Sequence, residues 1–404
     1  MIINNQSSSS VISLLLARIF YSVNWFNISS MFYLIVADFN QDISMLGFIT
    51  AAFYIGIGLF QVPAGILAAK YGPKRIAIYG IIITSSAALL SGLAVFLLQI
   101  TILRFVVGLG MALFFGPSVI LISKYLGKGS EGYGVGLLNS AHALGGIIGI
   151  FGWIVIAQLI GWRMSVVLGG LLGLTTAFIL YIVLSTKKEK EGEKEEKKII
   201  THSSPSLSPY FKLKLSDIEN TLSNRSLIIL GVILLGFQIS STLTSTFTVY
   251  YLNQHLNVNP IIAGLVGSLP LIMALAFSSI FGKVYDRAKH ANKLLIILGT
   301  LGTLSTAGIA TDVFYFVIVS IVIASIFMSG GFVIVYARAK QVNELKPEYQ
   351  PLAVSFVNGI GLFGGFWVPM VFSIIVTSMG YNLAWLFGSL FSFTLIIVPI
   401  LRLK

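Results

Sequence analysis

The basic residues of this 404-residue chain occupy alternate gaps between long apolar segments. Of its 26 lysines and arginines, all except Arg18, Arg104 and Arg163 lie in every second gap or in the C-terminal tail. The basic stretches are 70–75, 124–128, 187–225, 283–293, 338–346 and 402–404. The other gaps carry few charged residues, namely Asp38, Asp42, Arg163 and Asp312. Because helical membrane proteins keep lysine and arginine in cytoplasmic connections, this pattern predicts a polytopic membrane protein with both termini in the cytoplasm.

Composition also indicates that the chain lies in lipid. Hydrophobic residues make up 56% of the sequence and charged residues 10%, whereas soluble domains average about 25% charged residues. A helix needs about 20 apolar residues to cross the hydrocarbon core. Twelve segments meet this requirement: 11–37, 44–69, 76–96, 98–123, 132–159, 164–185, 226–252, 259–282, 292–311, 313–337, 351–378 and 382–401. We therefore expect an all-α, multi-pass protein of the cell membrane.

The segment between the sixth and seventh spans differs in composition from its surroundings. It reads KKEKEGEKEEKKIITHSSPSLSP, a run of mixed charge followed by a Ser/Pro tract. Such a sequence cannot bury enough apolar surface to fold alone. We interpret residues 186–225 as a cytoplasmic linker between an N-terminal six-helix bundle, 1–185, and a C-terminal one, 226–404. The linker is a solvated tether or, alternatively, its lysines have a regulatory or lipid-contacting role.

The two halves repeat each other at a nearly constant spacing. One set of residues recurs 219 positions later: Asn139, Gly145, Gly146 and Gly161 as Asn358, Gly364, Gly365 and Gly380. Another set recurs 217 positions later: Tyr33, Asn40, Gly47 and Gly65 as Tyr250, Asn257, Gly264 and Gly282. A parallel repeat of this kind is expected when two bundles share one ancestry.

Two copies of a short motif resemble the cytoplasmic signature of the major facilitator superfamily. The first is GILAAKYGPKR, residues 65–75, in which Ala69 replaces the aspartate of the signature. The second is GKVYDR, residues 282–287, which keeps the acid as Asp286. The chain therefore resembles this family in the motif that follows the second helix of each half.

The resemblance extends over nearly the whole chain. RFVVGLGMA, from Arg104, is similar to the arginine and glycine pattern of the family's fourth helix, and GWR, from Gly161, to the start of the sixth. The fifth span lacks the glycine-proline pair of antiporter and drug-efflux members, which disfavours export. The resemblance implies two six-helix bundles that face each other across a central substrate cavity.

Three ionisable side chains lie inside predicted spans: Arg18 in the first, Arg104 in the fourth and His142 in the fifth. A charge at the bilayer centre costs at least about 2.5 to 3.5 kcal/mol, so such groups are functional candidates. No Asp or Glu lies deep in any span. Because a buried cation needs a partner, the substrate could supply the missing carboxylate. This combination points towards an anion.

Each of these residues also has a structural interpretation. Arg18 is near enough to the inner surface to snorkel. The resemblance implies that Arg104 can organise the helix bundle as well as touch substrate. His142 is either a proton carrier or a neutral hydrogen-bonding residue between helices.

The resemblance further implies that the first, fourth, seventh and tenth helices line the cavity. The seventh reads GFQISSTLTSTFTVYY, whose polar residues recur at a spacing of three or four and share a face. We expect the substrate-binding residues to be Arg104, Arg18, Tyr21, Asn24, Trp25, Asn139, His142, Gln238, Ser241, Thr242, Ser245 and Asn358. Alternatively, the hydroxyl groups satisfy backbone carbonyls or help helices to pack.

Conformational gating is expected at the cytoplasmic motifs. The candidate residues are Gly65, Gly72, Lys74, Arg75, Gly282, Asp286, Arg287 and Arg338. Asp286 can accept hydrogen bonds from helix amides or pair with Arg287 or Arg338 when the cytoplasmic side is closed. We expect Asp286→Asn to favour the inward-open state, and cysteine accessibility of the cavity would test this.

These features predict a secondary active transporter that moves a small organic or inorganic anion by alternating access. One alternative is a polyspecific exporter of lipophilic compounds, although such proteins usually carry a buried carboxylate for cations. Another is a carrier of neutral solutes such as sugars, using Tyr21, Asn24, Trp25 and Gln238. A membrane scaffold or sensor without transport is the remaining alternative.

The sequence predicts no enzymatic activity and no cofactor. It contains no cysteine, and we find no metal-ligand cluster, nucleophile pair or phosphate loop. The expected partners are the lipid bilayer and a small-molecule substrate, with protons or a counter-transported anion for coupling. Protons would pass through His142 or the peripheral Asp38. The dispersed net charge of +12 disfavours nucleic acid, and we expect a monomer.

Overall fold

The computed structural model describes residues 5–126, 131–185, 220, 222–288, 290–340, 342 and 350–402. Its regular elements over these ranges are all helical. Those of the first half are α1 (Asn5–Ser30), α2 (Phe32–Asp38), α3 (Ser44–Tyr71), α4 (Pro73–Gly92), α5 (Leu97–Leu126), α6 (Glu131–Ile147), the π-helix η1 (Ile148–Gly152) and α7 (Trp153–Ser185). Those of the second half are α10 (Arg225–Tyr250), the π-helix η2 (Tyr251–His255), α11 (Pro260–Arg287), α12 (Ala291–Gly308), the 3₁₀ turn η3 (Ile309–Thr311), α13 (Phe314–Lys340), α14 (Gln350–Met379) and α15 (Tyr381–Ile400).

The predicted twelve membrane-spanning helices are confirmed. Among the described residues, eleven helical stretches are apolar and long enough to cross a bilayer, and one of them runs for 49 residues, from Gly136 to Leu184. At 1.5 Å per residue this stretch covers about 70 Å, more than twice the hydrocarbon thickness. It bends at Gly161, whose φ of 77° and ψ of 158° are not helical. Only a kink therefore separates the fifth and sixth spans, where the sequence suggested a short loop.

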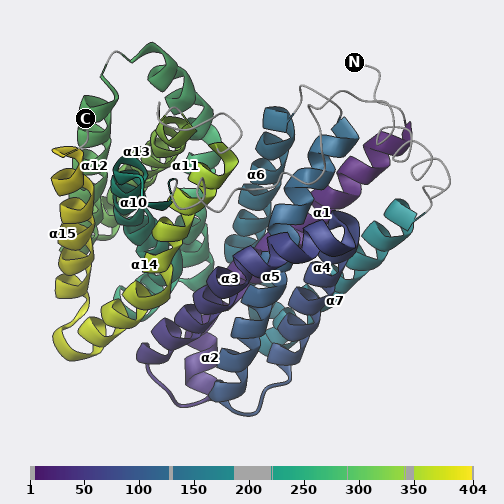
Figure 1. Cartoon of the computed structure of the whole chain (residues 1–404). Coiled ribbons are helices and arrows are strands. Elements are labelled where there is room, and N and C mark those ends of the chain that lie inside the picture. The colour runs from purple at the N-terminus through teal and green to yellow at the C-terminus, as the bar shows by residue number, and fades with distance from the viewer. Residues whose placement is uncertain are drawn as a thin grey trace.

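The helices form two bundles of six spans, as predicted. Figure 1 shows α1 to α7 on one side and α10 to α15 on the other, with the start of α1 and the end of α15 at the same end. One hydrophobic core lies within the first bundle, around Phe114, and another within the second, around Phe237. A third core draws on both bundles and includes Phe32 and Phe372. Nearly all of the predicted linker, 186–225, lies outside the described residues.

The internal repeat is visible in the backbone. Asn40 and Asn257 both have positive φ angles, 52° and 54°, which non-glycine residues seldom adopt. Gly161 and Gly380, at the start of the last span of each half, have similar positive φ angles of 77° and 87°. The two halves therefore turn in the same way at equivalent positions.

Contacts between the bundles follow the same repeat. Gly47 on α3 packs against Ser373 on α14, and Gly264 on α11 packs against Ile154 on α7. Gly47 and Gly264 are 217 positions apart, and Ile154 and Ser373 are 219 apart. Ser373 also donates a hydrogen bond to the Ser44 carbonyl at 3.3 Å. The first and second bundles thus meet through two related helix pairs.

The two ends of the molecule differ in charge and packing. Because successive spans are antiparallel, Lys74, Lys124, Arg287, Arg338 and Arg402 lie at one end, which we call the basic end. The other end carries Asp38, Asp42, Arg163 and Asp312. We call it the packed end because the third core joins the two bundles there. The start of α3 also meets α14 of the other bundle at this end, as Figure 1 shows. At this end Arg163 and Asp38 form an ion pair of 2.8 Å.

Candidate functional site

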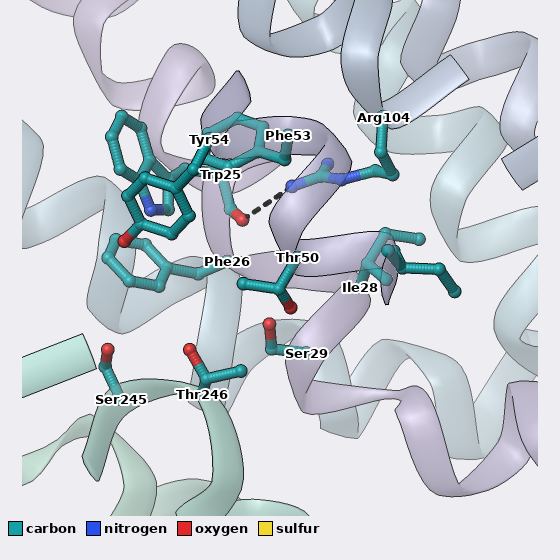
Figure 2. Close-up of a pocket in the computed structure, with 11 residues that line it drawn as sticks. Trp25, Phe26, Ile28, Ser29, Thr50, Phe53, Tyr54, Arg104, Ser245 and Thr246 are labelled. Carbon is teal, nitrogen blue, oxygen red and sulfur yellow. Dashed lines mark hydrogen bonds between the residues drawn. The ribbon is translucent and has the colours of Figure 1, made fainter. Parts of the chain in front are cut away.

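Arg104 lies in the interior of the protein, where it ties α5 to α1. Its side chain is 5% exposed. Nη1 donates to the carbonyl of Asn24 at 2.6 Å, and Nη2 donates to the carbonyl of Trp25 at 3.0 Å. The guanidinium carbon is also 4.7 Å from the centre of the Phe53 ring. Figure 2 shows the guanidinium directed towards the backbone of α1, with the bond to Trp25 dashed.

The guanidinium borders a pocket that both bundles line. The pocket is narrow, with a cavity volume of about 20 Å³. Residues of α1, α3 and α5 contribute most of its wall, and α10 contributes Ser245 and Thr246. Figure 2 shows the hydroxyl groups of Ser29 and Thr50 facing those of α10 across the space below Arg104. The complete lining is Trp25, Phe26, Ile28, Ser29, Ile49, Thr50, Phe53, Tyr54, Arg104, Ser245 and Thr246.

The charge of Arg104 has no counter-ion in the described part of the chain. The ion pairs found there join Arg163 to Asp38 and His255 to Asp312, both near the packed end. Backbone carbonyls satisfy two of the five guanidinium donors, but they do not neutralise the charge. A buried cation without an anion is costly, so the pocket is suited to an anionic ligand.

Tyr54 connects this pocket with α10, and the sequence did not point to it. Its ring packs edge-on against that of Trp25 on α1, with centroids 5.9 Å apart, and its hydroxyl group interacts with Thr242 on α10. Gln238 donates from Nε2 to Oγ1 of Thr242 at 3.1 Å, which extends the network. The family resemblance implied a cavity lined by the first, fourth, seventh and tenth helices, which leaves out α3. A usable signal was the polar and aromatic stretch TAAFY, in which Thr50, Phe53 and Tyr54 recur at helical spacing.

A comparison with known protein families covers nearly the whole chain. The family model described as Major Facilitator Superfamily matches residues 14–337 and 228–404. The chain belongs to the major facilitator superfamily. As in that superfamily, its structure places a central pocket between two six-helix bundles.

Two relatives of the chain are described as probable transporters. The chain is 27% identical over 402 residues to "Probable galactarate/D-glucarate transporter GudP" of Bacillus subtilis, covering 90% of this chain and 86% of that protein. It is 30% identical over 172 residues to "Probable sulfoacetate transporter SauU" of Cupriavidus necator, covering 42% of this chain and only 40% of that protein.

Solved structures of the superfamily share the fold. A bacterial homologue of the human lysosomal transporter Spinster, in an inward-facing and unoccupied conformation, matches with a TM-score of 0.77 at 16% identity. That match covers 99% of this chain and 95% of the other. The nucleoside transporter NupG matches with a TM-score of 0.77 at 12% identity, covering 99% and 100%.

Only some of the binding residues predicted for this chain lie at the Arg104 pocket. Arg104, Trp25 and Ser245 line it directly. Thr242 and Gln238 adjoin it through Tyr54.

Other predicted residues lie elsewhere. Asn24 is fully buried and donates to the Gly169 carbonyl on α7 at 3.3 Å, so its side chain points into the first bundle. Asn139 is exposed on α6. Asn358 accepts a hydrogen bond of 2.8 Å from Tyr336 inside the second bundle.

Two further groups of predicted residues are separate from the Arg104 pocket. Ser241 lines a second pocket, with a cavity volume of about 50 Å³, between α10, α11 and α13. Arg18, Tyr21 and His142 form a cluster between α1, α5 and α6.

The predicted gating residues lie at the basic end. Gly65 and Arg75 are exposed, Lys74 is half-buried, and Gly72 joins α3 to α4 with a φ of 88°. In the second half, Gly282 has open space except for Val333, and Arg287 is exposed. Arg338 donates from Nη1 to Oδ1 of Asn292. The side chain of Asp286 lies outside the described part, so the predicted latch stays a prediction.

Proposed function

We propose that the chain is a secondary transporter that carries small organic anions bearing a carboxylate across the cell membrane. The observation that carries this proposal is the Arg104 guanidinium, which borders an inter-bundle pocket with no carboxylate within 4 Å among the described residues. A substrate carboxylate would accept charge-assisted hydrogen bonds from its free donors. The binding of substrate would then remove the cost of an unpaired buried cation.

The relatives support the same class of substrate. Their descriptions name galactarate, D-glucarate and sulfoacetate. Each of these compounds carries at least one carboxylate that is ionised at neutral pH. Hydroxyl groups of Ser29, Thr50, Ser245 and Thr246 around the pocket would suit the hydroxyl groups of an aldarate.

Transport would proceed by rocking of the two bundles about the Arg104 pocket. The positive-inside rule assigns the basic end, and with it both termini, to the cytoplasm. Contacts between the bundles at the packed end would then close the outer side, so this arrangement corresponds to a state that faces inward. Anion release or entry would occur at the basic end.

Uptake into proteoliposomes tests the proposal. The probes are radiolabelled D-glucarate, galactarate and sulfoacetate, with glucose and tetraphenylphosphonium as neutral and cationic comparisons, under imposed pH and anion gradients. We expect anion uptake in the wild-type protein and none above background in Arg104→Gln. Arg402→Gln, an exposed arginine at the basic end, is the matched control and should transport normally. Uptake of glucose or the cation with all three anions inert would overturn the proposal.

A further inference from the structure

Arg18 is a second buried cation without a counter-ion among the described residues. Its side chain is 5% exposed, and its Nε and Nη1 atoms are buried without a hydrogen bond. The guanidinium carbon lies 4.3 Å from the centre of the Tyr21 ring and 4.8 Å from that of Phe115. In the described ranges no carboxylate lies within 4 Å of it. Aromatic faces attract a cation, but they do not satisfy N–H donors.

His142 lies beside this cation and has an unpartnered atom of its own. Its Nδ1 is buried without a hydrogen bond. The imidazole packs 6.2 Å from the Tyr21 ring and 5.7 Å from the Trp25 ring, and its charge would interact with that of Arg18. The Ser22 hydroxyl donates to the His142 carbonyl at 2.6 Å, which fixes α6 against α1.

Charged and titratable groups around the pair are few. The charged and titratable groups are Arg18 and Tyr21 on α1 and His142 itself on α6. The contact from α5 is the apolar ring of Phe115. A proton on His142 would place two like charges close together in a buried site. An anion between them would remove that repulsion and satisfy the free donors. Anion and proton should therefore favour each other's binding.

The cluster is distinct from the Arg104 pocket but adjacent to it. Arg18 precedes Asn24, whose carbonyl holds Arg104, by six positions on α1, which is about 9 Å along the axis. It lies towards the basic end, away from the contacts that join the bundles at the packed end. Trp25 links the two places, since it lines the pocket and packs on His142.

We propose that Arg18 and His142 form a second anion site, which binds a carboxylate together with one proton. This inference rests on the proposed function, because the site receives the anion that leaves or approaches Arg104. The carboxylate accepts hydrogen bonds from Nε and Nη1 of Arg18. A proton from solution binds Nδ1 of His142, which then donates to the carboxylate, so one anion and one proton enter together. The pair thereby couples anion transport to the proton gradient.

Calorimetric titration of purified protein in detergent tests the proposal. D-glucarate is titrated in buffers of different ionisation enthalpy, which gives the number of protons taken up per anion. We expect net proton uptake in the wild-type protein and none in His142→Gln, which should still bind the anion. His290→Gln, an exposed histidine at the basic end, is the matched control and should retain wild-type uptake. Proton uptake in His142→Gln equal to that of the wild type would overturn the inference.

Arg18 variants provide an independent readout. Arg18→Gln should abolish proton uptake and weaken binding by at least about thirtyfold. Arg18→Lys keeps the charge and should restore part of the proton uptake. This recovery would show that the loss in Arg18→Gln does not result from misfolding. Wild-type affinity and proton uptake in both variants would contradict the inference.

The outcomes separate the two proposals. No D-glucarate binding in the wild type, or binding that Arg104→Gln leaves intact, would count against the function proposed at Arg104. Anion binding that depends on Arg104 but involves no proton uptake would overturn the Arg18–His142 site alone.

Discussion

Gly365 and Tyr54 lie in contact across the two bundles. A Cβ atom on Gly365 would come within 2.6 Å of Cδ1 and Cε1 of the Tyr54 ring. Leu271 occupies the equivalent place beside Gly146, and Leu271 and Tyr54 are 217 positions apart. Since Tyr54 also lines the Arg104 pocket, this contact joins the packing of the bundles to the wall of that pocket.

Gly365→Ala should loosen the packed end. The added methyl group cannot fit beside the Tyr54 ring, so α14 must move away from α3 or the ring must shift. The chain has no cysteine, so Thr50→Cys in the pocket provides a single labelling site. We expect severalfold faster labelling by an impermeant maleimide added outside cells. Gly359→Ala, which has open space on the same helix, is the control. Equal labelling rates in the two variants would contradict this prediction.

Arg104→Lys should not preserve anion binding. Lysine keeps the charge, but a compact ammonium cannot bond both α1 carbonyls and also present a paired donor to a carboxylate. We expect anion affinity to fall by at least about tenfold while the protein remains folded. Equilibrium binding of radiolabelled D-glucarate, with gel filtration as the test of folding, measures both. Wild-type affinity in the lysine variant would show that the charge alone suffices.

Tyr54→Phe should weaken transport without unfolding the protein. The change removes the hydroxyl group that interacts with Thr242, and a polar interaction of this kind contributes about 0.5 to 1.5 kcal/mol. We expect a few-fold lower rate of uptake in proteoliposomes. The matched control is Tyr79→Phe, because Tyr79 is 56% exposed on α4. A rate equal to that of the control would show that the hydroxyl group is dispensable.

Asp312→Asn should make stability less dependent on pH. Burial raises the pKa of the Asp312 carboxyl, but hydrogen bonds from Asn382, Tyr251 and His255 outweigh it and hold the pKa below its ordinary value. The carboxylate therefore stabilises the fold above the ordinary pKa of about 3.9, and this stabilisation is lost as pH falls through the lowered pKa.

Thermal unfolding in detergent at pH 3 to 7 measures this effect. The Tyr251 and Asn382 bonds are both 2.8 Å, but the carboxyl is about one-third exposed, so we expect a loss of only about 0.5 to 1 kcal/mol at pH 7 in Asp312→Asn. The difference from wild type should shrink as pH falls from about 4 towards pH 3. A difference that persists or grows there would contradict the assignment.

The sequence determined the number of spans and the family because both depend on local properties. Apolar length decides whether a helix can cross the bilayer, and motifs such as GILAAKYGPKR need no tertiary information. The repeat was also visible, since Asn40 and Asn257 adopt the same left-handed turn. Arg104 could be selected because a cation in an apolar span is rare in any membrane protein.

Only the tertiary structure decided which polar residues meet. It directed Asn24 into the first bundle, brought Tyr54 to the pocket and separated Arg18 from Arg104. Helical spacing tells which residues share a face of one helix, but the neighbour of that face depends on how several helices rotate and pack together. That arrangement arises from contacts between residues far apart in the chain, such as Gly365 and Tyr54.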